Sequence, residues 1–160
     1  MTLVEFNRVP RYRAEAELIQ VCASRAWART IASRRPFHDL SRLQRAATEV
    51  WWGLDETDWR EAFHAHPKIG QRIVDGWAAR EQSGMNHAGA DVVLDLEQSN
   101  RDYLSKFGYI FIVCATGKTA DQMLAVLKSR LSNPAEQEIR VAAEEQSKIT
   151  QLRLERLITP

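Results

Sequence analysis

The feature that most constrains the fold is a single stretch, residues 109–116, with the composition of a buried β-strand. Aromatic and β-branched residues fill this stretch, as they do in strands that pack on both faces. A strand needs hydrogen-bonded partners, and the sequence contains no second convincing strand. The rest of the chain has helical periodicity. We therefore predict that residues 109–116 form a buried extended or helical segment inside an all-α domain.

Capping and breaking residues divide the rest of the chain into consecutive helices. The first long helix is expected over residues 13–34, because apolar side chains recur there at helical spacing and a proline follows. Asp39 and Asp55 are typical N-caps, and Thr119 with Gln122 fits a capping box. Later helices are expected over residues 39–53, 55–66, 74–83, 91–107, 119–131 and 133–157.

The last helix is expected to have Asn133 as its cap and Pro134 at its first position. The chain contains no internal repeat, low-complexity tract or linker. This organisation predicts an all-α, single-domain compact bundle of about seven to nine helices over residues 1–160. Residues 1–12 are expected to be a loose N-terminal segment.

Length and composition permit one globular domain with a real core. The chain has 160 residues, of which 44% are apolar and 27% charged, and its net charge is +1. The charges are interleaved, so there is no electrostatic case for nucleic acid or an anionic membrane as a partner. No apolar run reaches membrane-spanning length, and the first residues lack the pattern of a signal peptide. We expect a cytoplasmic protein whose Cys22 and Cys114 are buried free thiols.

A histidine and a carboxylate lie close enough in the sequence to suggest an acid–base pair. His66 opens the sequence HPKIG at residues 66–70, and Glu81 follows on a predicted helix. An imidazole and a carboxylate are the usual groups for proton transfer near neutral pH. Pro67 ends the helix that leads into His66, which places the imidazole at the end of an element. Taken separately, His66 fits a structural histidine and Glu81 fits a solvated helix charge.

One further motif looks like a nucleotide site but does not meet its requirements. Gly117, Lys118 and Thr119 match the last three residues of a phosphate-binding loop. Ile112, however, stands where that motif needs a glycine. The loop also needs a parallel sheet, which the sequence does not predict. A turn followed by a capped helix is the simpler interpretation.

Three histidines, His64, His66 and His87, suggest a metal site. His64 and His66 are two residues apart, so they do not share a helical face. No acidic or cysteine cluster accompanies them in the sequence. We therefore expect no metal, and we expect His64 and His87 to be surface or supporting residues.

Several segments in a fixed order resemble the family of 2-oxo-4-hydroxy-4-carboxy-5-ureidoimidazoline (OHCU) decarboxylases, enzymes of urate breakdown. The matching segments are residues 66–70, 81–84, 100–103, 107–111, 115–118, 123–133 and 148–154, with Cys22, Ser24, Trp27 and residues 35–37 near the start. The resemblance covers nearly the whole chain from about residue 14. Ala78 departs from the family pattern, in which many members carry a serine three residues before the Glu-Gln pair. This departure bears on substrate detail more than on the reaction class.

The resemblance implies an all-α fold, a homodimer and catalysis without a metal or an organic cofactor. It implies the reaction of a carboxy-lyase, which converts OHCU to (S)-allantoin and carbon dioxide in purine catabolism. Functional coupling to a 5-hydroxyisourate hydrolase is also expected, as the pathway suggests.

By the same resemblance, His66 is the acid–base group at the substrate hydroxyl, and Glu81 orients His66 or binds the substrate. Arg153 is expected to anchor an anionic or carbonyl oxygen, because a guanidinium binds planar oxygens in a fork. Three further parts of the chain are expected to bind the substrate. Pro67 fixes the position of His66, and Gln82 forms hydrogen bonds with the ring or ureido amides. The third part is the backbone of Phe111, Ile112 and Val113.

Two other functions stay open on the residues alone. A non-catalytic helical interaction module on the same scaffold would show no ligand-dependent stabilisation and would expose a large apolar patch. An enzyme that acts on a related ureide or hydantoin would keep His66 and Glu81 but change the residues that read the substrate. A substrate panel separates this enzyme from an OHCU decarboxylase.

Overall fold

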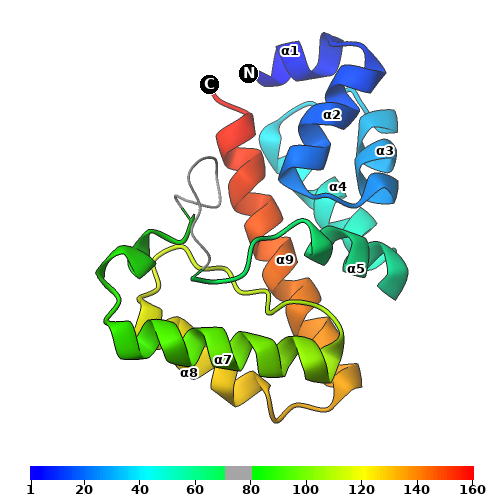
Figure 1. Cartoon of the computed structure of the whole chain (residues 1–160). Helices are drawn as coiled ribbons and strands as arrows, with labels where there is room; N and C mark the ends of the chain where they lie inside the picture. Colours follow the sequence, from blue (N-terminus) through cyan, green and yellow to red (C-terminus); the bar gives the residue numbers. More distant parts are fainter. Residues whose placement is uncertain (71–80) are drawn as a thin grey trace. The chain divides into compact units, whose positions relative to one another are not determined.

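Helices make up the structure, a computed structural model that describes residues 1–70 and 81–160, without the side chains of residues 86 and 87 (Figure 1). These described residues form eight α-helices and one 3-10 helix, and no β-strand is among them. The predicted all-α fold class is therefore confirmed. Most of the helix predicted over residues 74–83, including Ala78, lies outside the described residues.

The chain divides into two compact units, Met1–Ala62 with Gln146–Pro160, and Phe63–Glu145. The single domain expected over residues 1–160 stays a prediction. The first unit holds α1 (Leu3–Arg8), α2 (Arg11–Val21), α3 (Arg25–Ser33), α4 (Leu40–Trp52) and most of α5 (Glu56–His64). It also contains the C-terminal part of α9 (Ala135–Leu157).

Tryptophan side chains form much of the core of the first unit. Helix α3 packs against both α2 and α4. Trp27 on α3 is fully buried, and its Nε1 donates to the backbone carbonyl of Ala47 on α4 at 3.0 Å. Trp59 on α5 donates in the same way to the carbonyl of Trp51, also at 3.0 Å. The indoles of Trp27 and Trp59 therefore both have a hydrogen-bond partner, as burial of a polar N–H requires.

The helix predicted over residues 13–34 is two helices, so that prediction is wrong. Helix α2 ends at Val21, and Cys22 is in an extended conformation with φ −143° and ψ 117°. The hydroxyl of Ser24 then accepts a hydrogen bond from the backbone N–H of Trp27, which caps α3. The apolar spacing continues across this break, and for that reason periodicity did not reveal it.

The N-terminal segment is ordered rather than loose, which corrects the expectation for residues 1–12. Thr2 and Glu5 form a capping box at the start of α1. Phe6 on this helix is fully buried. The N-terminal amino group donates to the carbonyl of Leu157 at 3.0 Å, and the two ends of the chain lie side by side in Figure 1. Capping and packing together fix this segment.

The second unit is built on α7 (Ala90–Phe107) and α8 (Ala120–Arg130), which lie side by side in Figure 1, together with η1 (Ser83–His87) and the N-terminal part of α9. The predicted stop at Gly108 is confirmed, because this glycine has φ 79° and caps α7 in the left-handed region. The predicted capping box of Thr119 and Gln122 is also present at the start of α8.

The start of α9 differs from the prediction by one residue. The helix begins at Ala135 rather than at Pro134, and the carbonyl of Pro134 accepts from the backbone N–H of Glu138 at 2.9 Å. The side chain of Asn133, expected to cap the helix, instead donates from Nδ2 to Glu138 Oε2 at 2.8 Å. The amide group of Asn133 thus links the start of α9 to a buried carboxylate on the same helix.

Residues 109–115, between α7 and α8, form neither helix nor strand. Their side chains are buried apart from that of Ile110, which is half-buried, and Figure 1 shows an extended trace. The predicted buried extended segment is therefore confirmed. Tyr103 on α7 contacts it through ring pairs with Tyr109 and Phe111, at centroid distances of 5.9 and 5.4 Å. Aromatic packing therefore buries the side chains of this segment without a neighbouring strand.

Both cysteines are buried free thiols, as predicted. Burial raises the pKa of the Cys22 thiol to about 11, so the thiolate is disfavoured at neutral pH. Within the described residues, no helix is long and apolar enough to cross a membrane.

Candidate active site

His66 lies in the turn that follows α5. The helix ends at His64, and the backbone N–H of His66 donates to the carbonyl of Phe63 at 3.2 Å. Pro67 follows directly and prevents the helix from continuing. The imidazole is half-buried, whereas His64 is exposed. A half-buried histidine at a helix end is accessible to a ligand and still supported by its surroundings.

Two side chains fasten the turn that comes after His66 and Pro67. Gly70 has φ 85°, and its N–H donates to Oε1 of Gln82 at 3.1 Å. Asn100 on α7 donates from Nδ2 to the carbonyl of Ile69 at 3.0 Å, and this side chain is buried. The histidine segment is therefore tied to the Glu-Gln pair and to α7 within one unit.

The bond to Gly70 also fixes which atoms Gln82 presents elsewhere. A backbone N–H can only donate, so the amide atom that faces it must be the oxygen. The Nε2 group of Gln82 then points away from Gly70 with its two donors. Gln82 is buried, with 8% of its surface exposed. It is suited to donate to a carbonyl oxygen of a ligand rather than to accept from a ring N–H.

Glu81 is buried, which disagrees with a solvated helix charge. Only 8% of its surface is exposed. Burial raises the pKa of the Cys114 thiol, and the negative charges of Glu145 and Glu81 raise it further, whereas Lys118 opposes them. Lys118 also donates from Nζ to the carbonyl of Cys114 at 2.9 Å. The carboxylate of Glu81 thus lies close enough to the loop after residue 113 to influence its electrostatics.

The backbone of Phe111, Ile112 and Val113 is buried, and one of its acceptors is already engaged. Nη1 of Arg130 on α8 donates to the carbonyl of Ile112 at 2.6 Å. Arg130 in turn forms an ion pair with the fully buried Glu138 on α9. The Ile112 carbonyl is therefore a poorer candidate for substrate binding than the sequence suggested.

Tyr103 extends this buried network. Its hydroxyl donates to Oε1 of Glu138 at 2.5 Å. Burial is the main reason that the pKa of Tyr103 lies well above its usual range, so the phenol stays protonated and remains a donor. The sequence interpretation assigned no role to Arg130, Glu138 or Asn100.

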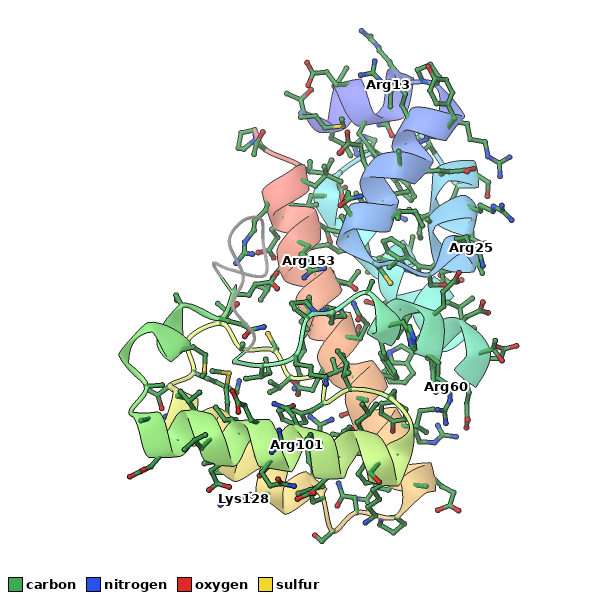
Figure 2. All side chains as sticks on the ribbon, viewed as in Figure 1. Arg13, Arg25, Arg60, Arg101, Lys128 and Arg153 are labelled. Carbon is green, nitrogen blue, oxygen red and sulfur yellow. The ribbon has the colours of Figure 1, made fainter. Side chains whose placement is uncertain are left out.

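Arg153 lies on α9 in the first unit, whereas the other predicted site residues lie in the second. Figure 2 labels this arginine, whose side chain is half-buried. Its Nη1 lies 3.5 Å from the carbonyl of Gln20 and 3.4 Å from that of Val21, both at the end of α2. These contacts hold the guanidinium at the C-terminal end of a helix, where the macrodipole favours a cation.

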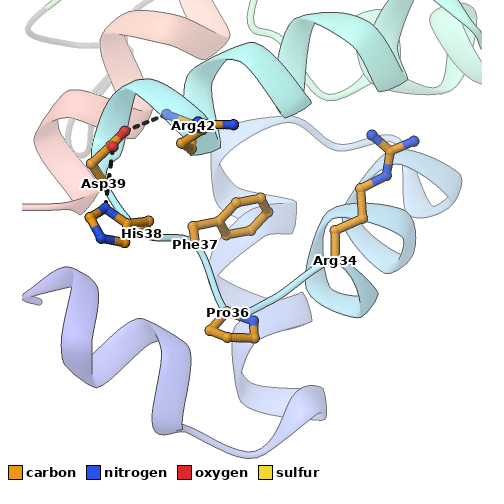
Figure 3. Close-up of a pocket in the computed structure, with 6 residues that line it drawn as sticks. All are labelled: Arg34, Pro36, Phe37, His38, Asp39 and Arg42. Atoms are coloured by element: carbon orange, nitrogen blue, oxygen red, sulfur yellow. Dashed lines mark hydrogen bonds and ion pairs between the residues drawn. The ribbon is translucent and has the colours of Figure 1, made fainter.

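A surface hollow in the first unit contains none of the predicted site residues (Figure 3). Its volume is about 800 Å³, and Arg34, Pro36, Phe37, His38, Asp39 and Arg42 line it. Asp39 caps α4, and the hydrogen bond from the backbone N–H of Arg42 holds the pKa of its carboxyl below the usual value. The predicted cap is confirmed, and its carboxylate already serves the helix.

Neither a metal cluster nor a phosphate loop is visible in the described part of the chain. No group of three or more His, Cys, Asp or Glu side chains is placed there to hold an ion. Gly117 has φ 78° and forms a turn before the capped helix α8, as the simpler interpretation predicted. His87 lies in η1, and its side chain is not among those described.

Gly84 is predicted to be intolerant of any side chain, because η1 passes very close to the loop before α8. A Cβ atom at Gly84 would lie 2.0 Å from the backbone oxygen of Lys118. We expect Gly84→Ala to lower the free energy of unfolding by about 2 kcal/mol and to displace the adjacent Glu-Gln pair. Thermal unfolding and steady-state kinetics measure both effects. Gly89→Ala is the matched control, since a Cβ there meets nothing within 4 Å. Equal effects of the two substitutions would contradict the role of this close approach.

The second unit thus holds a half-buried histidine, and the segment that contains it is hydrogen-bonded to a buried Glu-Gln pair. A histidine and a carboxylate are common groups for proton transfer. Comparison with known proteins identifies the family. The chain belongs to the OHCU decarboxylase family, whose sequence profile matches residues 7–155.

Individual relatives agree with this assignment. The chain is 36% identical to the uric acid degradation bifunctional protein TTL of Arabidopsis thaliana, over 86% of this chain and 45% of that protein. It is 32% identical to a putative OHCU decarboxylase of Homo sapiens, over 82% of this chain and 80% of that protein. A crystal structure of OHCU decarboxylase in the presence of (S)-allantoin has a TM-score of 0.82 and 34% identity, over 90% of this chain and 98% of that one.

The lengths covered differ among the relatives. The chain spans 45% of the Arabidopsis bifunctional protein, and 25% and 33% of those from two Bacillus sources. It covers most of the length of the single-function decarboxylases. The predicted family is therefore confirmed.

Proposed function

We propose that this protein decarboxylates OHCU to (S)-allantoin and carbon dioxide with His66 as its acid–base group. The observation that carries the proposal is the tie between the histidine segment and the buried Glu-Gln pair, through Gly70 and Gln82. This tie puts a proton carrier, a carboxylate and a fixed amide donor in one unit. The family assignment then supplies the substrate on which such groups act.

The substrate needs no external electron sink. The bond between the carboxylate and the carbon that bears the hydroxyl breaks, and its electron pair forms a double bond to the adjacent carbon. The electrons of the C=N bond move onto its nitrogen, which takes up a proton from solvent. Carbon dioxide leaves, the hydroxyl oxygen becomes a carbonyl as it loses its proton, and the adjacent carbon gains a proton on one face. In many other decarboxylases, pyridoxal phosphate or thiamine accepts this electron pair. The protein therefore has to orient the carboxylate, take the hydroxyl proton and let the adjacent carbon be protonated on one face only.

The predicted residues divide these tasks among themselves. His66 takes the hydroxyl proton, Pro67 fixes its position, and Glu81 orients the imidazole and supports its charged form. Arg153 binds an anionic or carbonyl oxygen of the substrate. Gln82 donates to a ring or ureido carbonyl, and backbone groups of residues 111–113 other than the Ile112 carbonyl bind the hydantoin-like ring.

We expect Glu81→Ala to weaken both substrate binding and turnover, because it removes a buried charge next to the histidine segment. The predicted change in kcat/KM is roughly tenfold to a hundredfold, the usual effect of losing a hydrogen bond to a charged group. Steady-state kinetics with freshly prepared OHCU measures it. Glu97→Ala, which changes an exposed glutamate on α7, is the control. If Glu81→Ala had wild-type kinetics, Glu81 would have no part in substrate binding or turnover.

A panel of related compounds tests the choice of substrate. The protein is mixed with OHCU and with other ureides and hydantoins, and dissolved carbon dioxide is measured against time. The proposal predicts release from OHCU well above the uncatalysed rate and little from the others. Preference for another member of the panel would identify an enzyme of a related ureide. No release and no ligand-dependent rise in melting temperature would favour the interaction module.

The quaternary and cellular context is also part of the proposal. We expect a homodimer in the cytoplasm that works together with a 5-hydroxyisourate hydrolase. The names of the bifunctional relatives support such coupling, since they describe a second activity of uric acid degradation in the same chain. Sedimentation equilibrium measures the oligomeric state.

A further inference from the structure

A buried ion pair in the second unit lies against the backbone that is proposed to bind the substrate. Arg130 is 5% exposed and Glu138 is fully buried, and their Nη2 and Oε1 atoms are 2.5 Å apart. Glu138 also accepts from Asn133 Nδ2 at 2.8 Å. The Nη1 atom of the same guanidinium donates to the carbonyl of Ile112, in the segment that is proposed to bind the substrate, at 2.6 Å. The guanidinium also lies over the Phe111 ring, 4.6 Å from the centroid.

A second side chain holds the same segment two residues further on. The backbone N–H of Cys114 donates to Oε2 of Glu145 on α9 at 2.7 Å. In extended backbone, the hydrogen-bonding groups of alternate residues point to the same edge. Ile112 and Cys114 are therefore both held from one edge, by side chains of α8 and α9. By the same alternation, the backbone groups of Phe111 and Val113 are directed to the opposite edge.

We infer that Arg130 and Glu145 are positioning residues, which hold one edge of residues 111–115 so that the backbone groups of Phe111 and Val113 face the substrate. The inference rests on the proposed function, because it assumes that the edge with the backbone groups of Phe111 and Val113 binds the ring of OHCU. A buried ion pair by itself is seldom more stabilising than apolar side chains of the same size. An apolar residue in place of Arg130 could not donate to the Ile112 carbonyl and so could not orient it.

Arg130→Lys tests the role of the guanidinium. A lysine keeps the positive charge for Glu138, but its single ammonium lacks the fork that reaches both Glu138 and the Ile112 carbonyl. We expect KM for OHCU to rise roughly tenfold while kcat stays within about threefold of wild type. The reason is that the segment binds the ring, whereas His66 moves the proton. Arg140→Lys, an exposed change on α9, is the matched control and should leave both constants unchanged.

Glu145 supplies an independent test that leaves the buried Arg130–Glu138 pair intact. Glu145→Ala removes the acceptor for Cys114 and should raise KM in the same way, whereas Glu145→Gln keeps an acceptor oxygen and should restore it. If Arg130→Lys does not fold, the contrast between these two variants decides. A purely structural role would lower the folded fraction and the apparent kcat at unchanged KM, and that result would overturn the inference. Inactive wild-type protein would instead overturn the proposed function.

Discussion

Replacing His66 with asparagine is expected to lower kcat for OHCU decarboxylation by about a hundredfold or more, with the fold intact. Asparagine keeps a polar side chain of similar size but cannot carry a proton near neutral pH. The imidazole is half-buried in a turn outside the core, so a polar replacement of similar size is expected to leave the fold intact. Stopped-flow absorbance of OHCU measures the rate, and a thermal melt confirms the fold.

His64→Asn is the matched control for this prediction. His64 has the same chemistry, lies two residues earlier and is exposed at the last residue of α5. The structure predicts wild-type turnover for this variant. If His66→Asn retained wild-type turnover, His66 would have no part in the mechanism. Equal losses in the two variants would point to a general disturbance of the helix end.

Replacing Glu138 with alanine is expected to lower the free energy of unfolding by about 3–5 kcal/mol. The change leaves the buried guanidinium of Arg130 without its counter-charge and removes the acceptor of the Tyr103 hydroxyl. A buried charge without a partner is among the largest single destabilising effects in proteins. Urea unfolding followed by tryptophan fluorescence measures the difference.

Glu144→Ala provides the comparison, because Glu144 is an exposed residue of the same helix. Its removal should change stability by less than about 0.5 kcal/mol. A Glu138→Ala variant as stable as Glu144→Ala would show that the ion pair contributes nothing net to the fold. The orienting role inferred for Arg130 would then need to be judged from the KM measurements alone.

Local capping chemistry made most of the helix boundaries predictable. Asp39, Thr119 and Gly108 act at helix ends as their residue types predict. The break at Ser24 was missed because the apolar spacing on either side of it stays in phase, although serine before a helical run is itself a capping signal. The start of α9 differs by one residue, because Pro134 supplies the carbonyl of the first helical hydrogen bond and Ala135 is the first helical residue.

The candidate site could be proposed from the sequence where its chemistry lies in short motifs, whereas residues whose part depends on burial drew no proposal. His66, Glu81 and Gln82 stand in recognisable segments of the sequence. Arg130 was read only as part of a matching segment, because a basic residue near a helix end is usually a surface residue. Its partner Glu138 lies on the next helix, so no helical spacing rule connects the two. Asn100 carried a weak signal, since asparagine is unfavourable within a helix unless its side chain has another task.

The most direct test of the central claim is the chirality of the product. Circular dichroism is recorded while 5-hydroxyisourate and its hydrolase generate OHCU, with and without this protein. A rapidly growing signal of (S)-allantoin that disappears with His66→Asn is the result predicted here. Only slow formation of racemic allantoin, at the same rate with and without the protein, would contradict the assignment of this chain as an OHCU decarboxylase that acts through His66.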